Sequence, residues 1–253
     1  MSRIEIHPGG GEVSAPLTLK HHMSRICKQI DLQGKRVLDC GCGKGHYVIA
    51  LLEQGADAWG IEYEASKVAE YKQLHPDLGE RVSQGDIEKM EYPDESFDIA
   101  LLHEVLDHVP DDNAALREIH RILKPGGSII LFTPNRLHPF ERHGVYLKRT
   151  KILVHRYVPF IPYVPVPVGK IFFTYWARNY WPRELQKMVT SAGFKITETD
   201  YIWPLYEMVP GKRQPAWLPF VKKNASALSL LGEKLPLVRV FGTSQYIQAV
   251  KEG

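Results

Sequence analysis

The sequence predicts an α/β fold in which a doubly wound, mostly parallel sheet of seven strands carries helices on both faces. Strand and helix patterns alternate through the first half of the chain, which is typical of such sheets. The first apolar run ends in closely spaced glycines, as at a strand-to-helix turn. The run at 97–102 is apolar apart from Asp98, which indicates a central strand buried on both faces.

The elements of the first half follow from apolar runs and the residues that end them. The predicted strands cover residues 36–39, 58–61, 81–84, 97–102 and 128–132. The predicted helices cover 47–54, 66–74 and a segment opened by 111–112. Gly55 is well placed to end the first helix, and Pro76 stops the second because the residue before a proline disfavours helical geometry.

The alternation breaks between 134 and 181, where prolines, aromatic residues and basic residues follow no period. We interpret this segment as a cap insertion after the fifth strand. A helix at 182–192 and strands at 194–201 and 244–250 complete the sheet, whereas 203–241 is proline-rich and receives no assignment. We therefore expect one domain over 1–253, with a cofactor-binding core at 35–133, a substrate cap at 134–181 and a C-terminal part at 182–253.

Composition limits the class of protein. The 253 residues are 44% hydrophobic and carry a formal charge of +3, which fits a globular chain and is too small to indicate nucleic acid. Three cysteines without spaced pairs argue against a disulfide framework or a zinc site, so we expect a reduced, cytoplasmic protein. No signal peptide is recognisable at the N-terminus, and no run of about 18 apolar residues predicts a membrane span.

The segment that follows the first strand predicts a ligand-binding turn. Glycines at 41, 43 and 45 allow a sharp turn and close approach of a ligand, and Asp39 precedes them. A dinucleotide fingerprint would need a third glycine at 46, where His46 stands, and the frame of a phosphate-binding P-loop is absent. The spacing therefore suits a cofactor without a pyrophosphate.

Two further acidic residues follow the next strands. Glu62 ends the second strand, where a carboxylate accepts hydrogen bonds from both hydroxyls of a ribose. Asp86 ends the third strand, where it is placed to accept from an adenine amino group while Ile87 packs on the ring. Both lie at carboxyl ends of strands, where open α/β sheets bind their ligands.

These elements, in this order, resemble the class I S-adenosylmethionine-dependent methyltransferases, of the methyltransferase type 11 kind with a Rossmann-like sheet. The resemblance is carried by VLDCGCGKG, the Glu of WGIE, the Asp of QGDI, FDIALLHEVLDHV and LKPGGSIILFTPN. It implies S-adenosylmethionine as cofactor, held by the glycine loop, Glu62 and Asp86, with His103 lining it after the fourth strand. It also implies an enzyme, a methyltransferase, with a small-molecule acceptor.

Within that class the chain resembles the ubiquinone-pathway O-methyltransferases and the small-molecule enzymes around them. The run Glu104-Val105-Leu106-Asp107-His108 resembles their Glu-x-x-Glu-His, which can hold a divalent metal beside a catechol. Asp107 replaces the second Glu, so we assign no metal, and a capping role for these residues stays open. The Asn-Pro-Pro-Tyr signature of nucleic-acid N-methylating enzymes is missing after the fourth strand, which favours O- or C-methylation of a small molecule and no nucleic-acid partner.

A hydroxyl acceptor also requires a general base, and histidine is the usual choice near neutral pH. We place His108 first because the end of the fourth strand faces the methyl group in this class; His138 and His143 in the cap are the alternatives.

Lys20, His21 and His22 could fold over the cofactor carboxylate as a lid. A catalytically silent subunit and a nicotinamide oxidoreductase on the same fold remain as other functions.

The cap should determine which acceptor enters. Basic residues alternate with aromatic ones through it, which fits a peripheral membrane contact through 140–168 that admits a lipophilic, quinone-like acceptor. The alternative is a folded cap with its own small core and solvated charges. The oligomeric state does not follow from the sequence.

Overall fold

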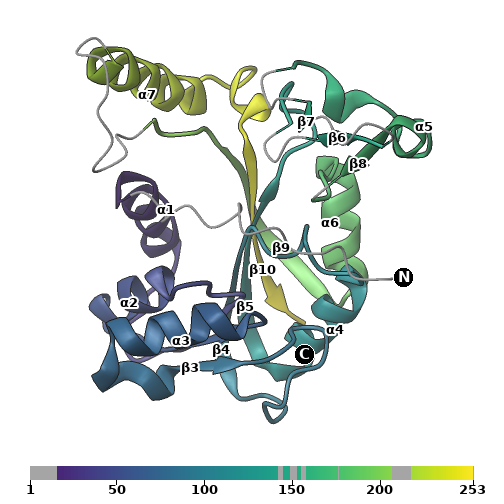
Figure 1. The fold of residues 1–253 in the computed structure, drawn as a ribbon. Coiled ribbons are helices and arrows are strands. Elements are labelled where there is room, and N and C mark those ends of the chain that lie inside the picture. Colours follow the sequence, from purple (N-terminus) through teal and green to yellow (C-terminus); the bar gives the residue numbers. More distant parts are fainter. Residues whose placement is uncertain are drawn as a thin grey trace.

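The computed structural model describes residues 16–141, 145–148, 153–154, 158–175, 177–206 and 218–252. Within these ranges the centre is a seven-stranded sheet in the order β3-β2-β1-β4-β5-β10-β9 (Figure 1). Its strands are β1 (Arg36–Cys40), β2 (Asp57–Glu62), β3 (Val82–Gln84), β4 (Phe97–His103), β5 (Leu123–Pro134), β9 (Phe194–Ile202) and β10 (Ser244–Lys251). Only β10 runs antiparallel to its neighbours, so the predicted mostly parallel sheet is confirmed.

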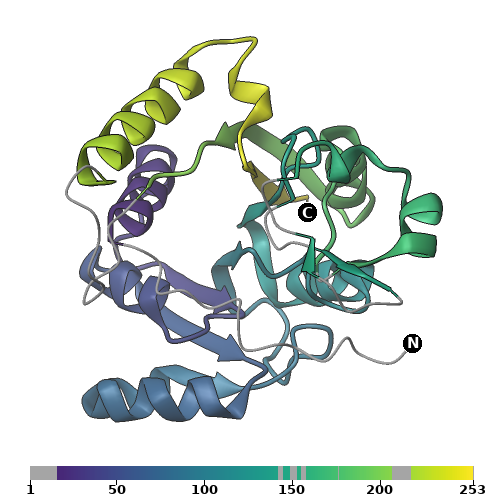
Figure 2. The same ribbon diagram turned by 45° about the horizontal axis from the view of Figure 1, so that its top comes forward.

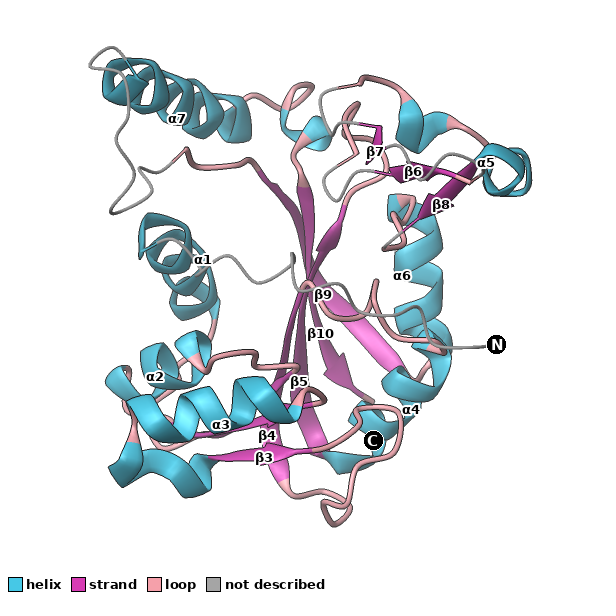
Figure 3. Cartoon of the chain, viewed as in Figure 1, coloured by secondary structure: helices cyan, strands magenta, loops and turns pink. Residues whose placement is uncertain are grey.

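Helices cover both faces of the sheet, as Figure 3 shows. One face carries α1 (Pro16–Gln29), α2 (His46–Glu53) and α3 (Ala65–Leu74), and the other carries α4 (Asp112–Ile122) and α6 (Pro182–Ser191). Successive strand residues point to opposite faces, so Val37 packs against the first group and Leu38 against the second. Two apolar cores therefore hold the sheet between its helical layers.

Local sequence signals begin and end these helices. The side chain of Asp111 accepts a hydrogen bond from Ala114 N–H at 3.0 Å and caps α4, whose residues Leu116 and Ile119 are fully buried. Pro182 occupies the first position of α6, where its missing N–H costs no hydrogen bond. Gly193 follows α6 with φ of 91°, a conformation that favours glycine.

Two excursions leave the carboxyl edge of the sheet. The first follows β5 and contains β6 (Val145–Leu147), β7 (Leu153–Val154), the 3-10 turn η2 (Ile161–Tyr163), α5 (Val166–Phe172) and β8 (Phe173–Tyr175), with the strands in the order β7-β6-β8. It occupies the segment that the sequence predicts as a cap.

The second excursion follows β9 and contains α7 (Leu218–Lys234) and the 3-10 turn η3 (Arg239–Phe241). Another 3-10 turn, η1 (Pro76–Arg81), precedes β3. Since β5 and β9 end at this edge and β10 begins there, both excursions project from one end of the molecule, on either side of the strand ends (Figures 1 and 2). None of the described helices is both long and apolar enough to cross a membrane.

Candidate cofactor site

The glycine loop joins β1 to α2 at the carboxyl edge. Gly41, Gly43 and Gly45 have φ of 75°, 56° and 77°, which other residues rarely adopt. A Cβ on Gly41 would lie 2.6 Å from the side chain of Val105, and one on Gly45 would lie 2.3 Å from the ring of Tyr71. Apart from its two chain neighbours, no described residue has an atom within 4 Å of a Cβ built on Gly43. Packing thus explains Gly41 and Gly45, whereas Gly43 borders open space.

Glu62 lies beneath this loop at the end of β2 and is buried. Its Oε2 accepts from Gly43 N–H at 2.8 Å, and its Oε1 accepts from Glu64 N–H at 2.9 Å. A carboxylate offers about four acceptor positions, so these two bonds orient the group and leave positions for the two hydroxyls of a ribose. The carboxylate is held in place before any ligand arrives.

Asp39 is the second buried acid of the loop. Its Oδ2 has no hydrogen-bond partner among the described residues. Burial, with a smaller contribution from the charge of Glu62, raises the pKa of Asp39 to about 8. A buried, unpartnered carboxyl oxygen beside a second carboxylate suits a cationic ligand. The site therefore fits S-adenosylmethionine, which carries an ammonium and a sulfonium.

The end of β3 contributes Asp86 and Ile87. Asp86 is partly exposed, and its Oδ1 accepts from Glu88 N–H at 3.0 Å. Ile87 is buried in the same apolar core as Ile61. Gly85 is confined as well, because a Cβ there would lie 2.6 Å from the side chain of Ile61. Packing against the apolar core therefore fixes the turn after β3. The Asp86 carboxyl lies at the carboxyl edge of the sheet, as Glu62 does.

His103 ends β4 within a cluster of rings. Its ring centroid lies 4.6 Å from that of Tyr47 and 4.9 Å from that of His22, and Phe132 lies beneath them. The Nδ1 of His22 and the hydroxyl of Tyr47 are 2.6 Å apart and hydrogen-bonded. Helix α1 thereby carries a buried histidine to the carboxyl edge, where Tyr47 follows the glycine loop.

Only part of this ring cluster could be predicted from the sequence. Charge and position single out Lys20, His21 and His22 as a lid, without predicting a helix. In the structure His22 reaches the ring cluster, His21 Nε2 lies 3.1 Å from Glu233 Oε1, and Lys20 is exposed. Of the three, His22 is therefore the one that borders the candidate site.

The loop after β4 holds the proposed base. His108 is exposed, and its Nε2 lies 3.3 Å from Oδ2 of the buried Asp107. Glu104 has φ of 56° and accepts from the hydroxyl of Ser244 at 2.7 Å, so it is tied to β10. In the part of the chain that the structure describes, no group of three or more His, Cys, Asp or Glu side chains is placed to hold a metal ion. Asp111, rather than these residues, caps the following helix.

His138 lies instead at an apolar cavity of about 400 Å³ between the two excursions. The cavity is lined by His138, Pro139, Phe140, Pro159, Phe160, Tyr163, Trp203 and Phe241. The Nδ1–H of His138 donates to the carbonyl of Phe241 at 2.8 Å, since a carbonyl oxygen only accepts. In that tautomer Nε2 is the acceptor nitrogen of the ring. His143, the other candidate in the cap, lies outside the described residues.

A buried arginine fixes the cap beside this cavity. Nε of Arg136 donates to the carbonyl of Pro162 at 2.7 Å, and its Nη2 donates to that of Val164 at 2.8 Å. Its guanidinium also lies 5.2 Å from the ring centroid of Trp181. Arg136, which alternates with aromatic residues in the sequence, thus has a structural role within the cap.

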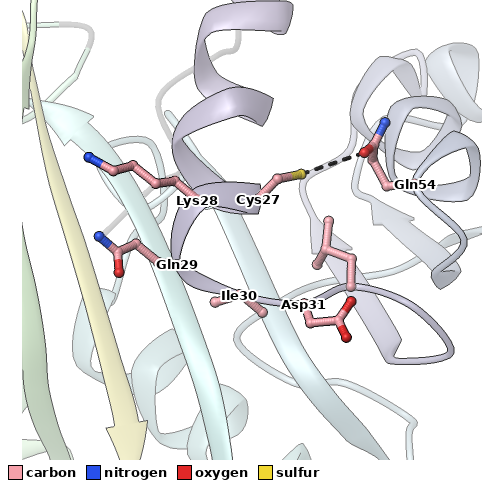
Figure 4. Close-up of a pocket in the computed structure, with 7 residues that line it drawn as sticks. Cys27, Lys28, Gln29, Ile30, Asp31 and Gln54 are labelled. Atoms are coloured by element: carbon pink, nitrogen blue, oxygen red, sulfur yellow. Dashed lines mark hydrogen bonds between the residues drawn. The ribbon is translucent and has the colours of Figure 1, made fainter.

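A different hollow, of about 320 Å³, lies at the opposite edge of the sheet (Figure 4). It is formed where α1 ends before β1 and where Gln54 follows α2, with Cys27 Sγ donating to Gln54 Oε1 at 3.8 Å. Burial raises the pKa of the Cys27 thiol, which disfavours a reactive thiolate. The position of this hollow and the chemistry of its lining separate it from the site at the glycine loop.

Comparison with known proteins identifies the central segment. Residues 38–131 match a family model described as a methyltransferase domain. The ubiquinone biosynthesis O-methyltransferase of Pseudomonas aeruginosa (strain UCBPP-PA14) is 38% identical over 115 residues, which cover 44% of this chain and 49% of that protein. The protein of the same name from Pseudomonas fluorescens (strain SBW25) is 36% identical over 114 residues, with the same coverage. The matched region therefore spans about half the length of these relatives.

Solved structures extend the likeness to the whole fold. An S-adenosylmethionine-dependent methyltransferase from Mesorhizobium loti has a TM-score of 0.60 at 18% identity, covering 90% of this chain and 96% of that one. The cyclase SpnF has a TM-score of 0.53 at 20% identity, covering 92% of this chain and 80% of that one. At such identities the likeness concerns the fold alone.

Fold and matched segment together define the class: an α/β chain with a Rossmann-like sheet, of which residues 38–131 match a methyltransferase domain. The chain has the fold of the S-adenosylmethionine-dependent methyltransferases, and S-adenosylmethionine is the cofactor that this class implies. The resemblance found in the sequence motifs is thus confirmed.

Proposed function

We propose that this protein transfers the methyl group of S-adenosylmethionine to a hydroxyl oxygen of a small lipophilic, quinone-like acceptor. The observation that carries the proposal is the pair of buried acids, Asp39 and Glu62, next to the open space at Gly43. The apolar cavity lined by Trp203 and Phe241 supports a lipophilic acceptor. The Pseudomonas relatives, ubiquinone biosynthesis O-methyltransferases, support transfer to an oxygen atom of a quinone-like compound.

The residues of the chain have distinct tasks in this proposal. Glu62 binds the ribose and Asp86 the adenine amino group, while Asp39 faces the cationic part of the cofactor beside the three glycines. The bound cofactor supplies an activated methyl group. Transfer from a sulfonium is an in-line displacement that neutralises charge, so alignment and exclusion of water are the protein's main contributions.

The acceptor hydroxyl must also lose its proton. We propose His108 as the general base, since the carboxylate of Asp107, 3.3 Å from its Nε2, would stabilise the imidazolium that forms. His138 is the second candidate, because it lines the apolar cavity and its Nδ1–H is already engaged by Phe241. The two differ in location: His108 belongs to the loop after β4, and His138 to the cap.

An assay with labelled cofactor tests both function and base. Methyl transfer from S-adenosylmethionine to hydroquinones and catechols with and without a prenyl tail should favour the tailed compounds. His108→Ala should lower kcat by about 10²- to 10⁴-fold, as expected for loss of a general base, while His138→Ala should not. The reverse result would move the base to the cap. Cofactor binding without transfer to any acceptor would favour a catalytically silent subunit, and reduction of a substrate by NADH would favour an oxidoreductase.

The domain organisation, location and partners of the protein are part of the same proposal. We propose that it works as one domain, with 35–133 binding the cofactor and 134–181 and 182–253 shaping the acceptor side. Its three cysteines are free of disulfides, which supports the reducing, cytoplasmic location that we propose. We also propose that the protein has no nucleic-acid partner.

A further inference from the structure

Helix α7 packs against the protein with the reverse of the usual orientation. A surface helix normally buries its apolar stripe and exposes its polar face. In α7 the buried residues are Ser229 and Gly232. The large apolar residues point outward, with Phe220 72%, Leu228 68% and Leu231 52% exposed. Helical spacing places these three side chains on one face of the helix, at positions i, i+8 and i+11.

Polar contacts hold the helix in this orientation. Glu233 Oε1 accepts from Trp203 N–H at 2.9 Å and lies 3.1 Å from His21 Nε2. The hydroxyl of Ser226 accepts from Tyr206 N–H at 2.8 Å. Burial of the apolar face therefore does not position α7, and that face is left for another environment.

The apolar surface continues beyond the end of α7. Leu235, Leu237, Val238 and Phe241 are all exposed, Leu237 at 86%. We call the outward residues of 218–241 the docking face. At the same end of the molecule, across the strand ends in Figures 1 and 2, α5 exposes apolar residues of its own. These are Val166, Val168, Ile171 and Phe172.

The charges of this segment have one sign on the outward side. Residues 218–241 contain Lys222, Lys223, Lys234 and Arg239 but a single acid, Glu233, which faces α1 and Trp203. Arg239 pairs with Asp200 at 3.6 Å, so the exposed Lys223 and Lys234 supply the outward charge. An apolar face flanked by lysines is the pattern of a helix that lies in the interface of an anionic membrane. A symmetric contact with a second copy would instead bring the same lysines together, which like-charge repulsion disfavours.

We propose that the docking face binds the surface of an anionic lipid membrane, with α7 parallel to the bilayer and its apolar side chains in the headgroup boundary. This contact lies beyond the methyl-transfer proposal and differs in position from the contact expected through 140–168. It turns the carboxyl edge of the sheet toward the lipid. The cavity lined by Trp203 and Phe241 then opens beside the bilayer, from which a lipophilic acceptor enters.

Flotation of the full chain with vesicles tests the proposal without any activity measurement. We expect flotation with equal parts phosphatidylcholine and phosphatidylglycerol, and little with phosphatidylcholine alone. The double variant Leu228→Asp with Leu231→Asp should lose flotation, and Lys223→Ala should weaken partitioning about fivefold. The matched control is Leu74→Asp on α3, whose leucine is 60% exposed, and it should float like the unaltered protein.

Circular dichroism and light scattering accompany the flotation, so that folding and mass are known for each variant. A folded chain that does not float with anionic vesicles would overturn the proposal, as would equal flotation with both lipids. A dimer that becomes a monomer in the double variant, with no flotation of either protein, would assign the face to a second copy. Loss of flotation in Leu74→Asp would show that the effect is not specific to α7.

Discussion

Two glycines of the cofactor loop allow packing and ligand binding to be separated. Gly43 and Gly45 both have left-handed φ values, so an alanine at either position should cost about 1–2 kcal/mol of backbone strain. At Gly45 the new Cβ would also lie 2.3 Å from the ring of Tyr71, which is completely buried. Overpacking of this kind adds about 1–3 kcal/mol. Gly45→Ala should therefore destabilise the ligand-free protein by about 2–5 kcal/mol, and Gly43→Ala by about 1–2 kcal/mol.

Binding should show the opposite order. Apart from its two chain neighbours, the Cβ of Gly43→Ala meets no described residue within 4 Å, and it would enter the space that we assign to the cofactor. Urea unfolding gives the free energy of each variant, and titration calorimetry of the folded proteins gives the Kd for S-adenosylmethionine. Relative to Gly45→Ala, Gly43→Ala should lose less stability and more affinity. Equal losses of stability, or unchanged affinity in Gly43→Ala, would refute the assignment of that space.

Three further predictions test single side chains. Burial raises the pKa of Asp39 to about 8, so the ligand-free fold loses stability as the pH rises from the pKa of Asp39 in the unfolded chain toward 8. In urea unfolding Asp39→Asn should lose this pH dependence, and parallel pH profiles of the two proteins would contradict the prediction. Tyr180→Phe should cost about 1–3 kcal/mol of unfolding free energy, because the buried hydroxyl donates to Leu106 O and contacts Asp112; an unchanged urea midpoint would show that these bonds contribute nothing. Arg136→Met should loosen the cap, seen as faster amide exchange in 158–164 and a higher KM for the acceptor, with the Kd for S-adenosylmethionine within about twofold; a loss of cofactor affinity would place Arg136 in the cofactor site instead.

The central sheet could be predicted because its signals are local. The apolar run at 97–102, the glycines after 36–39 and the acids at 62 and 86 each mark a strand end, and β4, β1, β2 and β3 lie where these signals indicate. The carboxyl ends of parallel strands meet at one edge, so the spacing along the chain already groups Asp39, Glu62 and Asp86. Their burial and hydrogen bonds needed the structure, since the partners of Glu62 are backbone groups.

Helices α1 and α7 and the short strands of the cap were not predicted, for physical reasons. In α1 the buried positions include His22, which hides the apolar period that would indicate a helix. Helix α7 lies in the proline-rich segment 203–241, whose prolines obscure the helical spacing of its apolar residues. The strands β6, β7 and β8 have only two or three residues each, too few for an alternation to be seen.

The most direct test of the central claim is calorimetric titration of the unaltered protein and of Glu62→Ala with S-adenosylmethionine and, separately, with NADH. The two hydrogen bonds that we assign to Glu62 join a charged acceptor to the ribose, and each contributes about 1.5–3 kcal/mol. The account predicts binding of S-adenosylmethionine alone, weakened by at least about tenfold in Glu62→Ala. Binding of NADH, or binding of S-adenosylmethionine that the substitution leaves unchanged, would contradict the assignment of this edge as a methyltransferase cofactor site.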